Sequence, residues 1–176
     1  MMELLDIYDE NRNRTGKTFV RGTSLPAGQY RLVIHIVIFN SEGKMLIQQR
    51  TPTKDTDPNL WDVTVGGCAT AGDDSRSAAH RELMEELGLD IDFSHERPYI
   101  TINFESGFDD FYIFERDDID LTELTLQASE VQNVQWATMQ QVLAMLDRGE
   151  FIRYHEGFIR YLFDQRHHRG CHKKLI

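Results

Sequence analysis

Three glutamates lie close together in a stretch that is expected to be helical. They are Glu82, Glu85 and Glu86. Positions i, i+3 and i+4 of a helix lie on one face, so the three side chains are expected to converge. Like charges in this arrangement repel by roughly a few tenths of a kcal/mol per exposed pair, and a cation between them offsets the repulsion. Carboxylate clusters are typical ligands of Mg²⁺, and Mn²⁺ accepts similar oxygen ligands, so the spacing indicates a divalent metal site.

Two glycines precede this helix. Gly66 and Gly67 end a predicted strand and open the loop that leads into the helix. Because neither has a Cβ atom, backbone carbonyls and a substrate can approach closely there. A metal beside an accessible backbone is suited to binding a diphosphate. The alternative is a solvated acidic helix face paired with Arg76 and Arg81, and the glycine loop in front of the helix favours the metal site over it.

The apolar pattern predicts the elements that position these residues. Ala79, Leu83 and Leu87 form one stripe of a helix over residues 75–87, and Gly88 is a suitable C-terminal stop. Further strands are expected at residues 3–22 (two extended pieces), 30–40 with 44–50 as its hairpin partner, 61–67, 97–105 with 109–116 as its hairpin partner, and 130–138. Further helices are expected at 139–149 and 157–168. This order of elements predicts an α/β fold in which helices flank a mixed sheet.

The composition is typical of one globular, cytoplasmic domain. The chain has 176 residues, of which 40% are hydrophobic and 27% charged, and its formal net charge is −10. An acidic protein is a poor binder of phosphate backbones, so no nucleic-acid polymer is expected as a partner. No apolar run approaches the length of a membrane span, and no signal peptide is expected. Cys68 and Cys171 lie far apart, so neither a disulfide framework nor a zinc site is expected.

The spacing around the helix resembles the Nudix box. Gly67, Asp73 and the segment RELMEELGL (residues 81–89) follow one another as in that motif, with Asp73 standing where the family has a glutamate. The resemblance implies a Nudix-type α/β/α sandwich with a mixed β-sheet. It makes the chain a single Nudix domain (residues 1–176) with three parts: an N-terminal hairpin extension (1–24), a core (25–145), and a C-terminal helix with a basic tail (146–176).

The resemblance implies a role for each matching position of the motif. Glu82, Glu85 and Glu86 are the expected ligands of Mg²⁺ or Mn²⁺, with the Gly66 carbonyl as a further one. Arg81 is expected to orient the glutamates through ion pairs. The implied reaction is attack of a metal-activated water on one phosphorus of a small X-linked diphosphate, where X is a nucleoside or another organic group.

Two further positions belong to the expected site. Gly67 is expected to lie against the substrate. Glu130, at the start of the predicted strand EVQNVQW, is a candidate for the catalytic base or a fourth metal-binding carboxylate. A solvated glutamate at a strand start is the alternative for Glu130.

The flanking segments resemble the branch of the family that contains isopentenyl diphosphate isomerase. In that alignment Arg50 and Lys54 occupy positions that bind the diphosphate of the substrate, and surface basicity is the alternative. The isomerase needs a cysteine at the position of Gly66 and a histidine at that of Cys68, so hydrolysis is favoured over isomerisation. A non-catalytic, diphosphate-binding regulatory domain is the third hypothesis, and the complete set of glutamates opposes it.

Three features outside the motif carry less information. His35 lies in the central apolar strand and is expected to be a core histidine or a pocket wall. The N-terminal hairpin is expected either to add strands to the sheet or to swap within a homodimer. The tail RHHRGCHKK (residues 166–174) is expected to be solvated, with capture of a transition metal as the alternative.

Overall fold

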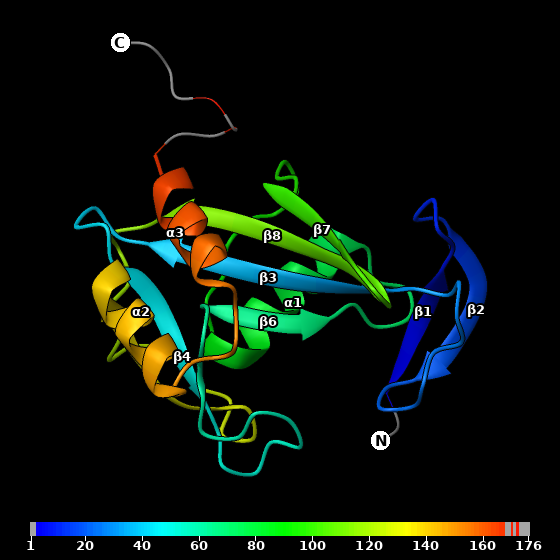
Figure 1. Ribbon diagram of the computed structural model, residues 1–176, viewed down its shortest axis with the longest axis horizontal. Coiled ribbons are helices and arrows are strands. Elements are labelled where there is room, and N and C mark those ends of the chain that lie inside the picture. The colour runs from blue at the N-terminus through cyan, green and yellow to red at the C-terminus, as the bar shows by residue number, and fades with distance from the viewer. Residues whose placement is uncertain (1–2, 168–169, 171, 173–176) are drawn as a thin grey trace.

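The described part of the chain, residues 3–167 with 170 and 172 of a computed structural model, forms two sheets and three helices (Figure 1). The helices are α1 (Ser75–Leu87), α2 (Met139–Arg148) and α3 (Glu156–Gln165). The smaller sheet contains β1 (Leu4–Tyr8) and β2 (Arg14–Val20). The larger sheet contains β3 (Arg31–Phe39), β4 (Met45–Arg50), β5 (Trp61–Asp62), β6 (Val65–Cys68), β7 (Ile100–Phe104), β8 (Gly107–Glu115) and β9 (Val131–Ala137).

The larger sheet is mixed, as the sequence predicts. Its strands follow the order β5–β4–β3–β8–β7, while β6 pairs with β3 and β9 pairs with β4. The pair formed by β3 and β8 is parallel, and the other pairs of this sheet are antiparallel. Because β3 is paired with β8 on one side and with β6 on the other, it forms the centre of the sheet. Its almost continuous apolar sequence is typical of such a buried strand.

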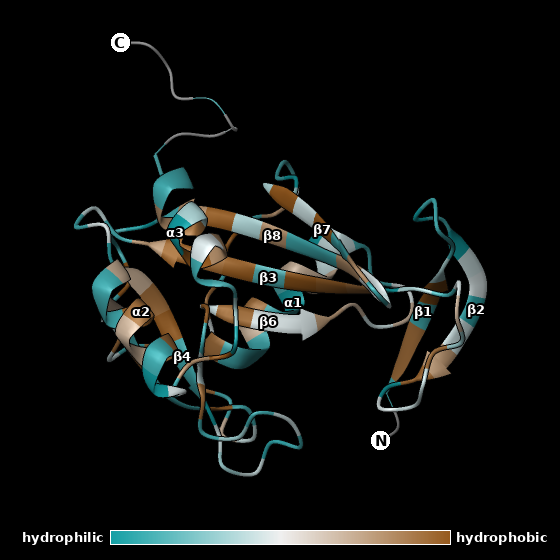
Figure 2. Ribbon diagram, viewed as in Figure 1, coloured by the Kyte–Doolittle hydropathy of each residue, from teal (hydrophilic) through white to brown (hydrophobic). Residues whose placement is uncertain are grey.

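Alternate residues of β3 face opposite helices, which makes the fold an α/β/α sandwich. Ile34, Ile36 and Ile38 belong to the cluster beneath α1, whereas Val37 and Phe39 belong to the cluster beneath α2 and α3. From the helices, the first cluster includes Ala79, Leu83 and Leu87, and the second includes Val142, Ile159 and Leu162. Figure 2 shows the resulting band of apolar residues along the central strands, with hydrophilic residues on the outer surfaces of the helices.

The hairpin predicted between β3 and β4 is wrong in its extent. The two strands pair at Phe39 and Met45, and the main partner of β4 is β9. The buried hydroxyl of Thr64 lies between β3 and β4: it accepts a hydrogen bond from Ile38 N at 2.9 Å and donates one to Leu46 O at 2.6 Å. This side chain bridges the backbone groups that would otherwise pair with each other, so the strands separate.

The single strand predicted over residues 61–67 is also wrong, because the chain changes partner within it. β5 pairs with β4, whereas β6 pairs with β3. In the second pairing Gly66 lies opposite His35 and Gly67 opposite Ile34. The change of partner brings both glycines to the central strand of the sheet and next to α1. The hairpin predicted from residues 97–105 and 109–116 is confirmed as β7 and β8.

The N-terminal hairpin forms its own sheet at the end of the molecule opposite α2 (Figure 1). Leu5, Ile7 and Tyr8 are buried, and Tyr8 exchanges backbone hydrogen bonds with Tyr30 at 2.8 and 3.0 Å. Arg12 forms an ion pair with the core carboxylate of Asp110. The hairpin therefore packs on the core of its own chain and adds no strand to the larger sheet among the described residues.

Local signals set both ends of α1 at the predicted residues. The Asp74 carboxylate accepts hydrogen bonds from the backbone N–H groups of Arg76 and Ser77, and Gly88 ends the helix with φ of 68°. No helix in the described part of the chain is long and apolar enough to cross a membrane. Of the predicted basic tail, residues 168, 169, 171 and 173–176 lie outside the described residues.

Candidate active site

The three glutamates of α1 differ in their burial. Glu82 and Glu86 are 7% and 5% exposed, although they are acidic, whereas the side chain of Glu85 is 50% exposed. Buried carboxylates are rare unless they are paired or bind a metal. The alternative of a solvated acidic face is therefore wrong for two of the three residues, and their burial needs a chemical reason.

Glu82 lies directly against the glycine loop. A Cβ atom added to Gly67 would lie only 2.5 Å from Glu82 Oε1, a distance that real contacts do not reach. The Glu82 carboxylate can thus occupy this position only because residue 67 is a glycine and has no side chain. Burial raises the pKa of Glu82, and the positive charge of Arg81 opposes that shift. Gly67 was expected to lie against the substrate, and the structure places it against a candidate metal ligand.

Arg81 connects the acidic residues of the motif. Its Nη1 atom donates to Glu82 Oε1 at 2.9 Å and to Glu85 Oε2 at 3.2 Å, and its Nε atom donates to Asp73 Oδ2 at 3.0 Å. Its Nη2 atom donates to the Cys68 carbonyl at 3.2 Å. These four contacts have the geometry expected of an orienting residue. They also assign a contact to Asp73, which holds the guanidinium rather than capping the helix.

Glu86 has the most perturbed environment of the three glutamates. Burial, together with the negative charges of Glu82, Glu130 and Asp62, raises its pKa to about 8, although Gln48 Nε2 donates a hydrogen bond to Glu86 Oε2 at 2.8 Å. Gln48 Oε1 is buried and has no hydrogen-bond partner among the described residues. Sequence reasoning missed Gln48, and the available signal was an amide in the otherwise apolar part of strand MLIQQR.

Cationic side chains form the other side of the same pocket. Lys54 Nζ forms an ion pair with the Glu130 carboxylate, so the structure brings both predicted residues to the site. Arg50 also lines the pocket, and its guanidinium donates to the carbonyls of Thr56 at 2.9 Å and Asp57 at 3.2 Å. Arg50 therefore stabilises the loop after β4 as well as lining the pocket.

The complete pocket has a volume of about 190 Å³ and is lined almost wholly by polar atoms. All of the predicted site residues lie in its wall. It is lined by Glu3, Arg21, Arg50, Lys54, Gly66, Gly67, Arg81, Glu82, Glu85, Glu86, Gln127 and Glu130. Three of these residues were not predicted, namely Glu3, Arg21 and Gln127. No local pattern could identify them, because they reach the pocket only through the docking of the N-terminal hairpin and of the segment before β9.

A second polar group lies behind Gly66, on the side of α2 and α3. A Cβ atom on Gly66 would lie 3.1 Å from His35 Nδ1, and the His35 ring stacks on Phe111 with 4.4 Å between centroids. Tyr154 Oη donates to Asp62 Oδ1 at 3.0 Å, and burial raises the pKa of Asp62. His35 thus packs behind the glycine loop, where the sequence predicted either a core histidine or a pocket wall.

Cys68 has the environment of an ordinary small side chain. Burial raises the pKa of its thiol, which opposes formation of a reactive thiolate. It is a free cysteine. Cys68 is partly buried, and its environment opposes a reactive role for the thiol.

The donor atoms of the pocket fit a hard divalent cation. They are carboxylate and carbonyl oxygens, which Mg²⁺ and Mn²⁺ prefer, and two of the carboxylates have raised pKa values that a nearby cation would lower. Gln48 Oε1 adds an unpartnered oxygen beside Glu86. Among the described residues, no three His, Cys, Asp or Glu side chains are already gathered as a metal cage. Arg81 instead donates hydrogen bonds to both Glu82 and Glu85.

Comparisons with known proteins agree with the motif and the fold. The model of the NUDIX domain matches residues 29–158. An uncharacterised Nudix hydrolase of Listeria innocua is 42% identical over 171 residues, covering 97% of this chain and 99% of its own. A Nudix hydrolase of Deinococcus radiodurans is 29% identical over 149 residues, covering 84% of this chain and 86% of its own.

Solved structures show the same architecture. The crystal structure of DR0079 from Deinococcus radiodurans superposes with a TM-score of 0.74 at 26% identity, covering 91% of this chain and 99% of DR0079. Nudix hydrolases act on small-molecule substrates and generally use divalent metals, in agreement with the oxygen donors gathered here. The chain belongs to the Nudix family and is a Nudix hydrolase.

Proposed function

We propose that this Nudix hydrolase cleaves a diphosphate linkage in a small X-linked diphosphate and that its metal is Mg²⁺, with Mn²⁺ as a substitute. The observation that carries the proposal is the division of one pocket into two sides. Glutamates of α1 supply oxygen ligands on one side, and Arg50 and Lys54 supply positive charge on the other. Guanidinium and ammonium groups are the usual partners of phosphate oxygens in proteins. A metal-bound diphosphate matches both sides at once.

The glutamates of α1 would hold the metal, together with the Gly66 carbonyl. When bound, a divalent cation lowers the pKa of water and offsets negative charge on phosphoryl oxygens. Arg81 keeps Glu82 and Glu85 directed into the pocket through its paired hydrogen bonds. Gln48 holds Glu86 through its amide, which fixes the carboxylate of the most buried candidate ligand.

Glu130 and Lys54 form a pair whose separation would prepare both for the reaction. Lys54 Nζ contacts the Glu130 carboxylate. A diphosphate that draws Lys54 to its own oxygens removes this partner from Glu130. The released carboxylate can then accept a proton from the attacking water, which is the role of a general base. Glu130 is therefore proposed as the base, and as a further ligand if the metal lies within its reach.

The test is incubation of the purified protein with Mg²⁺ and a panel of diphosphates, including isopentenyl diphosphate, with products identified by mass spectrometry. Glu86→Gln removes a buried charge and is expected to abolish cleavage. Glu123→Gln is the matched control, because it removes the same charge from an exposed position outside the pocket. Cleavage by the wild type and by E123Q, but not by E86Q, would support the proposal.

Two results would contradict it. Rearranged isopentenyl diphosphate without cleavage would establish the isomerase alternative, despite Gly66 and Cys68. Tight binding of a diphosphate without any product would establish a regulatory domain. The kinship with isopentenyl diphosphate isomerase, the homodimer and the cytoplasmic location stay predictions from the sequence.

A further inference from the structure

A second and larger cavity adjoins the carboxylate pocket. Its volume is about 620 Å³, and its walls are the N-terminal hairpin, the loop after β4 and the start of β9. The two cavities share Glu3, Arg21, Lys54 and Glu130 as lining residues. A substrate whose diphosphate lies in the smaller cavity therefore has room for its X group in the larger one. Cavities of this size are typical of sites for small organic ligands.

Arg31 is the basic residue of this cavity that has no carboxylate partner among the described residues. Arg21 Nη1 is paired with Glu3 Oε2 at 2.7 Å, and Lys54 is paired with Glu130. Arg31 forms no ion pair with any described residue. Its Nε atom is buried and has no hydrogen-bond partner among the described residues. A partly buried guanidinium without an anion is costly, and a phosphate would satisfy it with paired hydrogen bonds.

The position of Arg31 is fixed by the fold. Its guanidinium lies over the ring of Phe104, with 5.6 Å between its central carbon and the ring centroid. Its backbone N–H donates to the Ser106 carbonyl at 3.0 Å. Because the side chain is held between β7 and the cavity, binding an anion there requires little loss of conformational freedom.

The remaining lining residues favour a hydroxylated ligand over a nucleobase. Thr53, Thr56 and Ser129, whose side chains carry hydroxyls, are among the residues that line the wall. None of the described lining residues is aromatic, so the cavity offers no ring on which a base could stack. Hydroxyls of a sugar or polyol can exchange hydrogen bonds with Thr and Ser side chains in both directions.

We propose that this cavity binds the X group of the substrate and that X is a sugar or polyol bearing a second phosphate, which Arg31 receives with help from Arg21. This inference rests on the proposed function, since it assigns the diphosphate of the same molecule to the carboxylate pocket. The N-terminal hairpin is then a wall of the substrate site, because Glu3 and Arg21 lie in both cavities.

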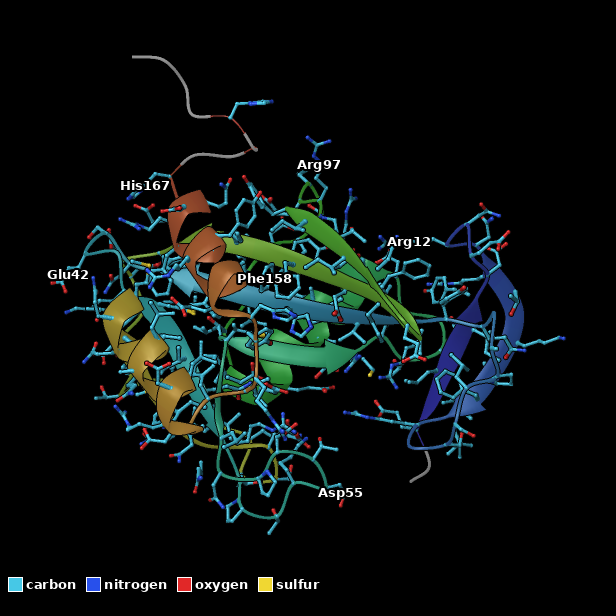
Figure 3. All side chains as sticks on the ribbon, viewed as in Figure 1. Arg12, Glu42, Asp55, Arg97, Phe158 and His167 are labelled. Atoms are coloured by element: carbon cyan, nitrogen blue, oxygen red, sulfur yellow. The ribbon has the colours of Figure 1, made fainter. Side chains whose placement is uncertain are left out.

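The test compares 5-phosphoribosyl 1-diphosphate with ribose 1-diphosphate, which lacks the distal phosphate. Arg31→Gln is expected to lower kcat/KM for the first compound about 10- to 100-fold and to change the second by less than about twofold, as loss of hydrogen bonds to a charged group predicts. Arg31→Lys, which keeps the charge, should restore part of the loss. Arg97→Gln is the matched control, because Arg97 is an exposed arginine on the other side of the sheet from Asp55 of the cavity wall (Figure 3).

A binding measurement separates this inference from the proposed function. Ribose 5-phosphate carries the distal group without any diphosphate, so its binding to metal-free protein, followed by NMR titration, does not depend on hydrolysis. The wild type and R97Q should bind it alike, and R31Q should bind it at least about tenfold more weakly. Equal binding by R31Q, or a preference of the wild type for nucleoside diphosphates over both sugar compounds, would overturn the inference. Failure of all hydrolysis with intact, Arg31-dependent binding would overturn the proposed function alone.

Discussion

Replacing Glu86 by glutamine should remove the pH dependence of stability that this residue gives the metal-free protein. Burial raises the pKa of Glu86 to about 8 in the folded protein, against an ordinary value of 4.5. Below about pH 4.5 both the folded and the unfolded chain hold the proton, so the residue has no effect there. Between the two values the unfolded chain releases a proton that the folded protein keeps, and stability falls as pH rises. Above about pH 8 the loss is complete.

The size of the effect follows from the shift. A difference of about 3.5 pKa units at about 1.4 kcal/mol per unit amounts to about 5 kcal/mol over the full range. About 4 kcal/mol of this falls between about pH 5 and about pH 9. The amide of E86Q does not ionise, and its carbonyl can still accept the hydrogen bond from Gln48. The variant should therefore escape this loss and become more stable than the wild type in mildly alkaline buffer without metal.

The assay is urea denaturation in EDTA at a series of pH values, followed by tryptophan fluorescence. The difference in unfolding free energy between wild type and E86Q isolates the residue from the other groups that titrate. E123Q should follow the wild type throughout. Added Mg²⁺ should stabilise the wild type more than E86Q, because a cation favours the ionised carboxylate. Equal pH dependence of wild type and E86Q in EDTA would refute the assignment of Glu86 as a buried, destabilised charge.

Three further changes test the site and its support. Gly67→Ala places a methyl group against the Glu82 carboxylate, so it should cost about 1 to 3 kcal/mol of stability and most of the activity. Thermal denaturation and an activity assay measure both effects. Gly157→Ala is the control, because the added atom meets nothing within 4 Å. Lys54→Gln should raise KM for the diphosphate about tenfold, as loss of one charged contact predicts, and an unchanged KM would contradict its phosphate-binding role. Thr64→Val leaves a buried N–H and a buried carbonyl unpaired, so it should lower the unfolding free energy in urea by about 2 to 4 kcal/mol, and a loss below about 0.5 kcal/mol would exclude the hydroxyl as a bridge between strands.

Local signals predicted the elements that local chemistry determines. The helix over residues 75–87 begins and ends where expected, because Asp74 caps it and Gly88 permits the left-handed turn that stops it. The pairing of β7 with β8 was predicted for a similar reason, since the turn between them is short. The layers of the fold follow from the almost continuous apolar sequence of β3, which buries both faces of the strand.

Contacts between distant segments account for what the sequence did not reveal. Thr64 lies between β3 and β4 in the structure, although it follows both strands in the chain. No periodicity of the sequence therefore marks its role. The burial of Glu82 and Glu86 also depends on neighbours from other strands. Arg21 enters the pocket only because β1 packs on the core. Arg31 has significance only because no described acidic residue forms an ion pair with it.

The separate sheet of the N-terminal hairpin has a consequence for how the enzyme can change. β1 supplies the buried anchors Leu5 and Ile7, whereas most of β2 is exposed. Backbone pairing holds β2 to β1 alone, but Arg14 of β2 donates a hydrogen bond to the Asp73 carbonyl in the loop that leads into α1. The hairpin therefore borders both cavities through Glu3 and Arg21 and also supports the loop before the helix that carries the glutamates. Exchange of this hairpin between relatives would change the walls of both cavities at once, so a new substrate preference would require the contacts of Arg14 and Asp6 with the loop before α1 to be kept.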